Sequence, residues 1–237
     1  MHLAKIRAFI FDMDGVLIDS ENLYKVIEQK LFDNAGVVID QDEHVSYQGS
    51  SNPVMWGKIK EKHQLHTPLD ELVRITEETV ISYFSSLPEI HPMPGVLKLL
   101  DELKERKIRM ALASSSTIDV ISIVLAKTGL ASYFDTVVDS TEAGAGKPDP
   151  AIFLLAQKKL GVPKENCVIL EDSANGIKAA TAAGMYCIAF NGPGSEHQDQ
   201  SAANWRISHF SEITEKFEHE KLRTRLKLLH REIITPE

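Results

Sequence analysis

The sequence predicts an α/β protein: a Rossmann-like parallel sheet with helices on both faces, and an α-helical cap domain inserted after the first strand. From residue 94 onward, short apolar runs alternate with helical patterns, as in parallel sheets joined by helices. A separate apolar run lies near the N-terminus. Residues 20–88 lie between these regions and show helical patterns without a convincing strand. We therefore expect one core domain from residues 1–19 and 89–237 and one helical domain from residues 20–88.

The first expected strand is the apolar run 8–11, which suits a strand covered on both faces. It is followed at once by Asp12 and Asp14, and Gly15 marks the point where the chain leaves the strand. Two unpaired carboxylates on one side of a strand would be costly in a core, so they must lie at its edge near a positive partner. A Mg²⁺ site and a solvated surface turn both explain the pair.

The remaining elements follow in order. In the inserted region, helical patterns cover 23–34, 54–62 and 69–84. A helix opened by Pro94 has Val96, Leu99, Leu100 and Leu103 on one face. Beyond it we expect strands over 108–113, 136–138, 167–170 and 185–190, and helices over 117–127, 150–160 and 174–183.

Composition excludes several classes of protein. The chain has 237 residues, 43% of them apolar and 25% charged, which is ordinary for a globular protein. Its net charge of −8 argues against nucleic acid and anionic membranes as partners. An apolar stretch long enough to span a membrane and a signal peptide are both lacking, so we expect a cytoplasmic protein. Cys167 and Cys187 lie in apolar runs and receive no chemical role.

Polar side chains follow several of the expected strands. Asp12 and Asp14 follow the first, and Ser114, Ser115 and Ser116 the second; Lys147 lies in the loop after the third, and Glu171 and Asp172 follow the fourth. A helix cap, a surface loop or a helix N-terminus explains each of these clusters alone. Ligands of open parallel sheets bind at the carboxyl ends of the strands, where all of the clusters would meet. Their joint occurrence favours a functional site.

These residues resemble a known family. The motifs DMDG, ASSS, GKP and EDS, in this order and spacing, are similar to those of the haloacid dehalogenase superfamily of aspartate-nucleophile phosphotransferases. The resemblance covers the α/β domain. The helical region then resembles the cap of the β-phosphoglucomutase-like branch.

The resemblance implies a role for each motif. Asp12 would be the nucleophile that forms an aspartyl-phosphate, and Asp14 the acid and base. The phosphoryl oxygens would be bound by Ser114 and Lys147. From its place beside Ser114 at the start of a helix, we expect Ser115 to complete the phosphate site. Mg²⁺ would be held by the Asp12 carboxylate, the Asp14 carbonyl and Asp172, with Glu171 a direct or water-mediated neighbour. The expected partner is a small phosphorylated metabolite.

Two departures bear on the branch of the family. The mutases that this chain resembles carry a histidine at the position of Tyr24. At the position of Asn52 they carry an arginine, which binds a second phosphate. We therefore expect hydrolysis of a small phosphate monoester such as a sugar phosphate, with a phosphosugar mutase as the alternative. A non-catalytic phosphometabolite-binding module is a further alternative, against which the intact motif set argues.

Other members of the superfamily fit the residues less well. A true dehalogenase needs neither a metal nor the second aspartate. A phosphonoacetaldehyde hydrolase would need a Schiff-base lysine in the cap, and we expect Lys58 and Lys60 to be solvated instead. Substrate choice would come from the cap, with Gly49, Ser50 and Asn52 as candidates and Trp56 as part of the cap core.

The C-terminal region 213–234 has apolar side chains at near-helical spacing. We expect a surface helix packed on the core, with a dimer contact as the alternative. The protein would then be a monomer or a weak homodimer. The nine histidines lack the spacing of zinc ligands, so no zinc site is expected.

Overall fold

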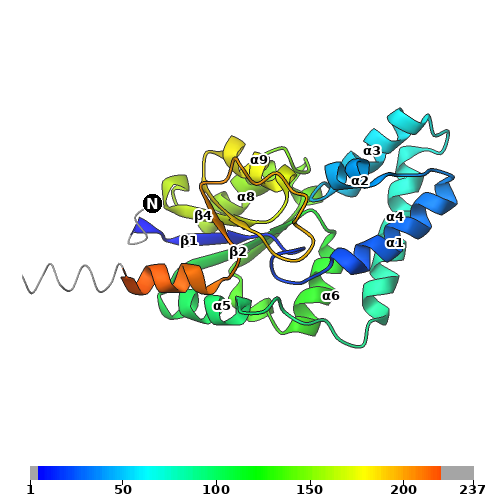
Figure 1. The fold of residues 1–237 in the computed structure, drawn as a ribbon. Coiled ribbons are helices and arrows are strands. Elements are labelled where there is room, and N and C mark those ends of the chain that lie inside the picture. The colour runs from blue at the N-terminus through cyan, green and yellow to red at the C-terminus, as the bar shows by residue number, and fades with distance from the viewer. Residues whose placement is uncertain (1–4, 220–237) are drawn as a thin grey trace, which may run out of the picture.

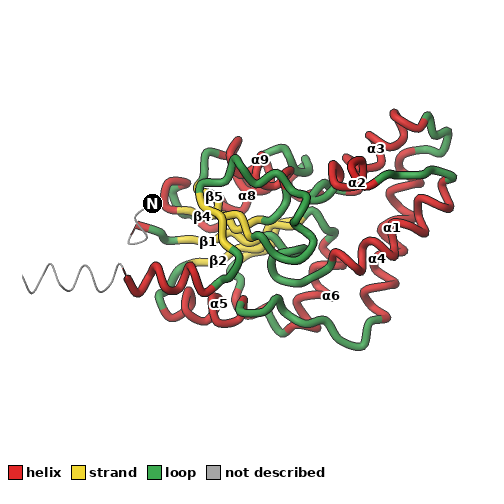
Figure 2. The backbone as a smooth tube through the Cα atoms, viewed as in Figure 1, coloured by secondary structure: helices red, strands yellow, loops and turns green. Residues whose placement is uncertain are grey.

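The computed structural model describes residues 5–219. Within this range, six parallel strands form one sheet in the order β3-β2-β1-β4-β5-β6 (Figures 1 and 2). The strands are β1 (Ala8–Phe11), β2 (Arg109–Ser114), β3 (Thr136–Asp139), β4 (Cys167–Glu171), β5 (Tyr186–Phe190) and β6 (Trp205–Ile207). The predicted α/β class with a parallel Rossmann-like sheet is confirmed.

Alternation along β1 gives the sheet its two covered faces. Phe9 and Phe11 belong to one buried cluster, which includes the apolar side chains of α5 (Val96–Glu105) and α6 (Ile118–Thr128). Ala8 and Ile10 belong to another, with α8 (Ala151–Leu160) and α9 (Ala174–Ala183). Successive strand residues point to opposite faces, so both faces need an apolar cover. Figure 1 shows α8 and α9 on one side of the sheet and α5 on the other.

The helices between β1 and α5 lie together at one end of the molecule, beyond the sheet (Figure 1). They are α1 (Glu21–Ala35), α2 (Gln41–Tyr47), α3 (Asn52–His63) and α4 (Leu69–Ser86). Trp56 on α3 is buried, and its Nε1 donates a hydrogen bond of 2.7 Å to Thr76 on α4, so it lies in the core of this unit as expected. We refer to α1–α4 as the cap helices; the domain boundaries at residues 19/20 and 88/89 stay a prediction.

The two chain segments that connect the cap helices to the sheet lie side by side. Met93 N donates to Leu17 O at 2.7 Å, and Ile18 and Pro92 form an antiparallel bridge. A further contact joins the units where Lys127 Nζ on α6 donates to Ser85 O on α4 at 2.9 Å. The cap helices and the sheet domain are therefore joined by the paired segments and by this contact.

Most expected elements are present within one or two residues of their predicted bounds. Among the α-helices and strands of the described chain, three were missed. Pro94 precedes α5, whose N-cap is Gly95. The missed elements are α2, β6 and the short helix α7 (Ser140–Ala143). Helix α2 has no apolar period, strand β6 carries Arg206 at its centre, and helix α7 is only 4 residues long.

The expected C-terminal helix begins as predicted. Residues 211–219 are helical, and Ile213 and Phe217 are buried against the core, with Arg106 lying 4.7 Å from the Phe217 ring centre. Its expected apolar residues Leu222, Leu226 and Leu229 lie outside the described residues.

The sequence expectations also concern the cysteines and the apolar character of the helices. Cys167 and Cys187 are buried free thiols. No helix among the described residues is long and apolar enough to cross a membrane.

Candidate active site

The site lies at the carboxyl end of β1, which is the switch point of the sheet. The connection after β1 leads to β2 on one side of β1, whereas the connection after β3 leads to β4 on the other side of β1. Such a point leaves a crevice beyond the strand ends where ligands bind. A pocket of about 980 Å³, counted to its open mouth, occupies this crevice and is lined by residues of both the sheet loops and the cap helices.

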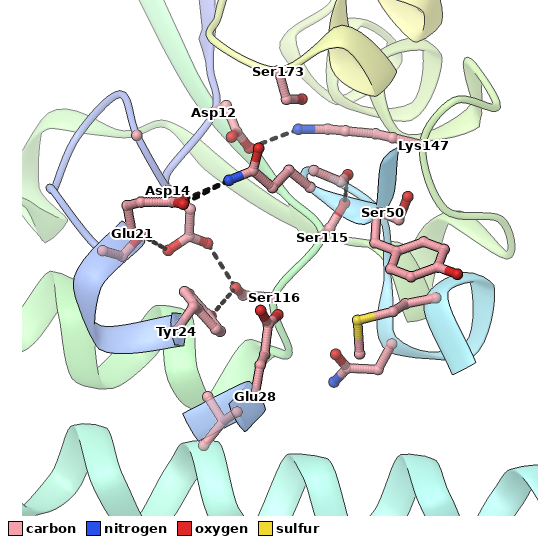
Figure 3. Close-up of a pocket in the computed structure, with 18 of the residues that line it drawn as sticks. Asp12, Asp14, Glu21, Tyr24, Glu28, Ser50, Ser115, Ser116, Lys147 and Ser173 are labelled. Atoms are coloured by element: carbon pink, nitrogen blue, oxygen red, sulfur yellow. Dashed lines mark hydrogen bonds and ion pairs between the residues drawn. The ribbon is translucent and has the colours of Figure 1, made fainter. Parts of the chain in front are cut away.

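Asp12 and Lys147 form a buried ion pair at the base of the pocket. Lys147 Nζ lies 2.6 Å from Asp12 Oδ1 (Figure 3). It also lies 2.7 Å from Glu171 Oε1, and the lysine is fully buried. Burial raises the pKa of Asp12 to about 7, helped by the nearby Glu171 and Asp14 carboxylates and opposed by Lys147. The pKa of Lys147 is raised, because its two carboxylate partners outweigh the effect of burial. The lysine therefore stays charged beside the expected nucleophile.

Asp14 is held by hydroxyl groups. Ser20 Oγ donates to Asp14 Oδ1 at 2.7 Å, and Ser116 Oγ donates to Asp14 Oδ2 at 2.8 Å (Figure 3). The Tyr24 hydroxyl lies 3.0 Å from Ser116 Oγ, which can accept from it. Burial raises the pKa of Asp14 against the effect of the two serines. A raised pKa is what a carboxyl group needs to carry a proton to a leaving oxygen.

Both carboxylate oxygens of Glu171 accept hydrogen bonds from neighbouring groups of the protein. Its Oε1 accepts from Lys147, while its Oε2 accepts from Asp172 N and Ser173 N, each at 2.8 Å, and from Ser173 Oγ at 3.0 Å. The side chain therefore orients Lys147 and the start of α9.

The carboxylates of Asp12, Glu171 and Asp172 fit a divalent cation. One oxygen from each lies within 4.8 Å of the others. Burial and the charges of Glu171 and Asp12 raise the pKa of Asp172 well above its usual range. A hard cation would relieve that repulsion and accept these oxygens as ligands. Because the hydrogen bonds of Glu171 are already made, Asp12 and Asp172 are the better placed ligands of the three.

Gly15 allows the close approach of Asp172 to the first motif. Its φ is +76°, and a Cβ at this position would lie 2.1 Å from Asp172 Oδ2. The turn is closed by Gly15 N donating to Ile18 O at 2.9 Å. Any side chain here would displace the expected metal ligand.

The serines after β2 have different surroundings. Ser114 is fully buried, and its Oγ accepts from Ser116 N at 3.1 Å. Ser115 lines the pocket, and its Oγ donates to Gly49 O of the cap region at 2.9 Å. Ser116, which received no role from the sequence, contacts Asp14 instead. Its partner is 102 positions away, so no local sequence signal identifies this contact.

The cap side of the pocket contains the expected specificity residues. Gly49, Ser50 and Asn52 line it, whereas Trp56 does not. Several other side chains on this wall were missed by sequence reasoning, among them Glu28 on α1 and His44 on α2. Their facing positions depend on the packing of two helices, one of which has no apolar period.

Neither candidate Schiff-base lysine lines the pocket. Lys58 is exposed, as expected. Lys60 is partly buried, and its Nζ donates to Leu65 O at 2.6 Å and to Thr67 O at 2.8 Å. The expectation that Lys60 is solvated is therefore wrong, because the side chain binds the backbone that follows α3.

Fold and site together define a phosphoryl-transfer enzyme of the haloacid dehalogenase type. Residues 6–184 match the haloacid dehalogenase-like hydrolase family, so the chain belongs to that family.

Particular relatives refine the comparison. Hexitol phosphatase B of Escherichia coli O157:H7 is 31% identical over 215 residues, covering 90% of this chain and 96% of that protein. The crystal structure of β-phosphoglucomutase from Clostridium difficile matches with a TM-score of 0.79 and 30% identity, covering 93% of this chain and 99% of that one. Protein SUPPRESSOR OF QUENCHING 1, chloroplastic, of Arabidopsis thaliana is 35% identical over 188 residues, which cover 78% of this chain but 18% of that longer protein. The chain is thus similar to both a phosphatase and a phosphoglucomutase.

Proposed function

We propose that the protein hydrolyses a small phosphate monoester, a sugar or polyol phosphate, through an aspartyl-phosphate intermediate in a Mg²⁺-dependent reaction. The observation that carries this proposal is the arrangement around Asp12. This carboxylate is bound by Lys147 on one side, adjoins the carboxylate of Asp172 on another, and shares its pocket with Asp14. The phosphatase relative and the family match support the same chemistry.

In the first half of the reaction, an Asp12 carboxylate oxygen attacks phosphorus as the ester P–O bond breaks. Asp14 gives its proton to the departing oxygen, which leaves as an alcohol. Lys147 supplies positive charge to the phosphoryl oxygens. Bound Mg²⁺, held by Asp12, Asp172 and the Asp14 carbonyl, would offset the negative charge of the carboxylates and of the phosphate.

In the second half, Asp14 takes a proton from water as that water attacks the aspartyl-phosphate. The Asp12–phosphorus bond breaks, inorganic phosphate leaves and both carboxyl groups return to their starting states. Ser20 and Ser116 hold Asp14 in one orientation for both proton transfers. Ser114 and Ser115 remain our candidates for phosphate contacts. The Ser115 hydroxyl, which in this structure donates to Gly49 O, would turn to the phosphate.

Phosphoglucomutase activity is the second candidate, favoured by the structural match to such an enzyme. A mutase must also hold a second phosphate. Asn52 lines the cap wall without a charge, and Lys147 is the one lysine among the described lining residues, which include no arginine. We therefore place hydrolysis first.

Phosphate release from a panel of sugar and polyol phosphates, with Mg²⁺ or EDTA, tests the proposal. Wild type is compared with Asp12→Asn, and Asp70→Asn on the exposed start of α4 is the matched control. We expect Mg²⁺-dependent release that is lost in Asp12→Asn and kept in Asp70→Asn. Isomerisation of β-glucose 1-phosphate primed by glucose 1,6-bisphosphate, without phosphate release, would establish the mutase instead. Absence of both activities would leave a binding module.

A further inference from the structure

The cap wall of the pocket is acidic. Glu21, Glu28 and Glu77 line it, and His44 is its one histidine among the described lining residues. Glu21 is already bound, because both its carboxylate oxygens accept from Gln48 Nε2 at 2.7 Å. The lysine at the base of the pocket, Lys147, is occupied by its two carboxylates. A ligand's organic part therefore meets carboxylates on this wall, and the two basic side chains of the described lining, Lys147 and His44, are already bound to carboxylates.

Glu28 is the carboxylate of this wall that a neighbouring side chain orients through one oxygen while the other, within the described chain, stays unbonded. Its Oε2 lies 2.5 Å from His44 Nε2, and the two side chains are only 18% and 15% exposed. The described residues give no hydrogen bond to its Oε1. Figure 3 shows the Glu28 carboxylate pointing from α1 toward the pocket interior near Ser116. His44 thus fixes one oxygen and leaves the other as an acceptor.

Thr117, at the N-cap of α6, provides a second free polar group. Its Oγ1 is the one buried side-chain oxygen or nitrogen within residues 5–219 that has no hydrogen-bond partner. The residue lines the same pocket as Glu28. Buried polar atoms normally have a partner, so a ligand hydroxyl is the natural group to satisfy this one.

We infer that Glu28, oriented by His44, determines specificity: it accepts a hydroxyl of an uncharged, polyhydroxylated leaving group and rejects substrates that carry a second anionic group. This inference rests on the proposed function and specifies its substrate class. A hydroxyl donates to a fixed carboxylate in a charge-assisted hydrogen bond. A second carboxylate or phosphate at the same place would have no proton to donate and would meet a like charge in a partly desolvated pocket.

A matched pair of ligands tests this inference. Sorbitol 6-phosphate and 6-phosphogluconate differ at the carbon far from the phosphate, which carries a hydroxymethyl group in the first and a carboxylate in the second. Their dissociation constants are measured by calorimetry with Mg²⁺ in the full chain carrying Asp12→Asn, which prevents turnover. We expect tighter binding of sorbitol 6-phosphate. Adding Glu28→Gln should lower that preference roughly tenfold, mainly through tighter binding of 6-phosphogluconate.

Two control variants separate this role from general effects. Glu61→Gln removes the same charge from an exposed position on α3 and should leave the preference unchanged. Thr117→Val should weaken both ligands similarly, because it removes a neutral hydroxyl.

An unchanged preference in Glu28→Gln, or an equal change in Glu61→Gln, would overturn the inference. Failure of both ligands to bind would overturn it as well. The proposed function is judged separately by phosphate release from the wild type, so hydrolysis with an unaltered preference would refute the role of Glu28 alone.

Discussion

Replacing Lys147 with methionine should strongly destabilise the protein. Methionine has a similar length but leaves Asp12 and Glu171 buried without the cation that lies 2.6 and 2.7 Å from them. Breaking a buried ion pair by removing one partner typically costs about 3–5 kcal/mol, because the remaining charge stays desolvated. Here two carboxylates lose the same partner, and Lys147 is fully buried. We therefore expect a loss of at least about 3 kcal/mol in the free energy of unfolding.

Urea unfolding followed by tryptophan fluorescence measures this loss. The experiment uses EDTA, so that no metal replaces the lost charge. With a urea dependence of about 3 kcal/mol per molar, the midpoint should fall by about 1 M. Lys178→Met, at an exposed position on α9, is the matched control and should leave the midpoint nearly unchanged. A Lys147→Met midpoint equal to that of the wild type would refute the assignment of this lysine as the main charge compensation in the site.

Three further predictions concern other parts of the structure. In Gly15→Ala, the new Cβ would lie 2.1 Å from Asp172 Oδ2, so we expect at least tenfold weaker Mg²⁺ binding by calorimetry; unchanged affinity would contradict this. Asn175→Ala removes amide hydrogen bonds of 2.8–3.1 Å to the cap segment at Ser46, Gln48 and Ser50, so we expect a larger radius of gyration in solution scattering; superimposable profiles would argue otherwise. Burial raises the pKa of Glu43, but hydrogen bonds from Lys62, Tyr47 and His63 outweigh it and lower the pKa to about 2. The charged form therefore stabilises the fold above pH 4.5, and this contribution is lost as pH falls toward 2. Glu43→Gln should be less stable than the wild type in urea at pH 7 by about 1–2 kcal/mol, with the difference shrinking at low pH; a pH-independent difference would contradict the assignment.

Most of the central sheet was predictable, because β1, β2, β4 and β5 are short apolar runs that are buried on both faces. Phe9 and Phe11 pack on one face and Ala8 and Ile10 on the other, so the run carries a strand signal without any distant information. The clustering of Asp12, Lys147 and Asp172 followed from the rule that parallel strands end at the same edge.

The cap wall was harder to predict, because its chemistry depends on how the cap helices pack. Helix α2 is short and mostly polar, so it gave no periodic signal, and its His44 could not be placed opposite Glu28. The hydroxyl partners of Asp14 were hidden for a related reason. Ser116 reaches Asp14 across a long sequence separation, and its neighbours Ser114 and Ser115 have the same residue type with different contacts. Residue type alone does not distinguish the three.

The position of the cap helices in the chain affects the entropy of forming the sheet. Ala8 on β1 pairs with Arg109 on β2. The two residues are roughly 100 positions apart, against roughly 30 without the inserted helices, and closing the longer loop costs only about 1 kcal/mol more. Because the cost grows with the logarithm of length, a cap of different size or shape could replace this one with little loss of sheet stability. The strand-end loops that form the floor of the pocket and the cap helices that form its wall can therefore change independently of each other.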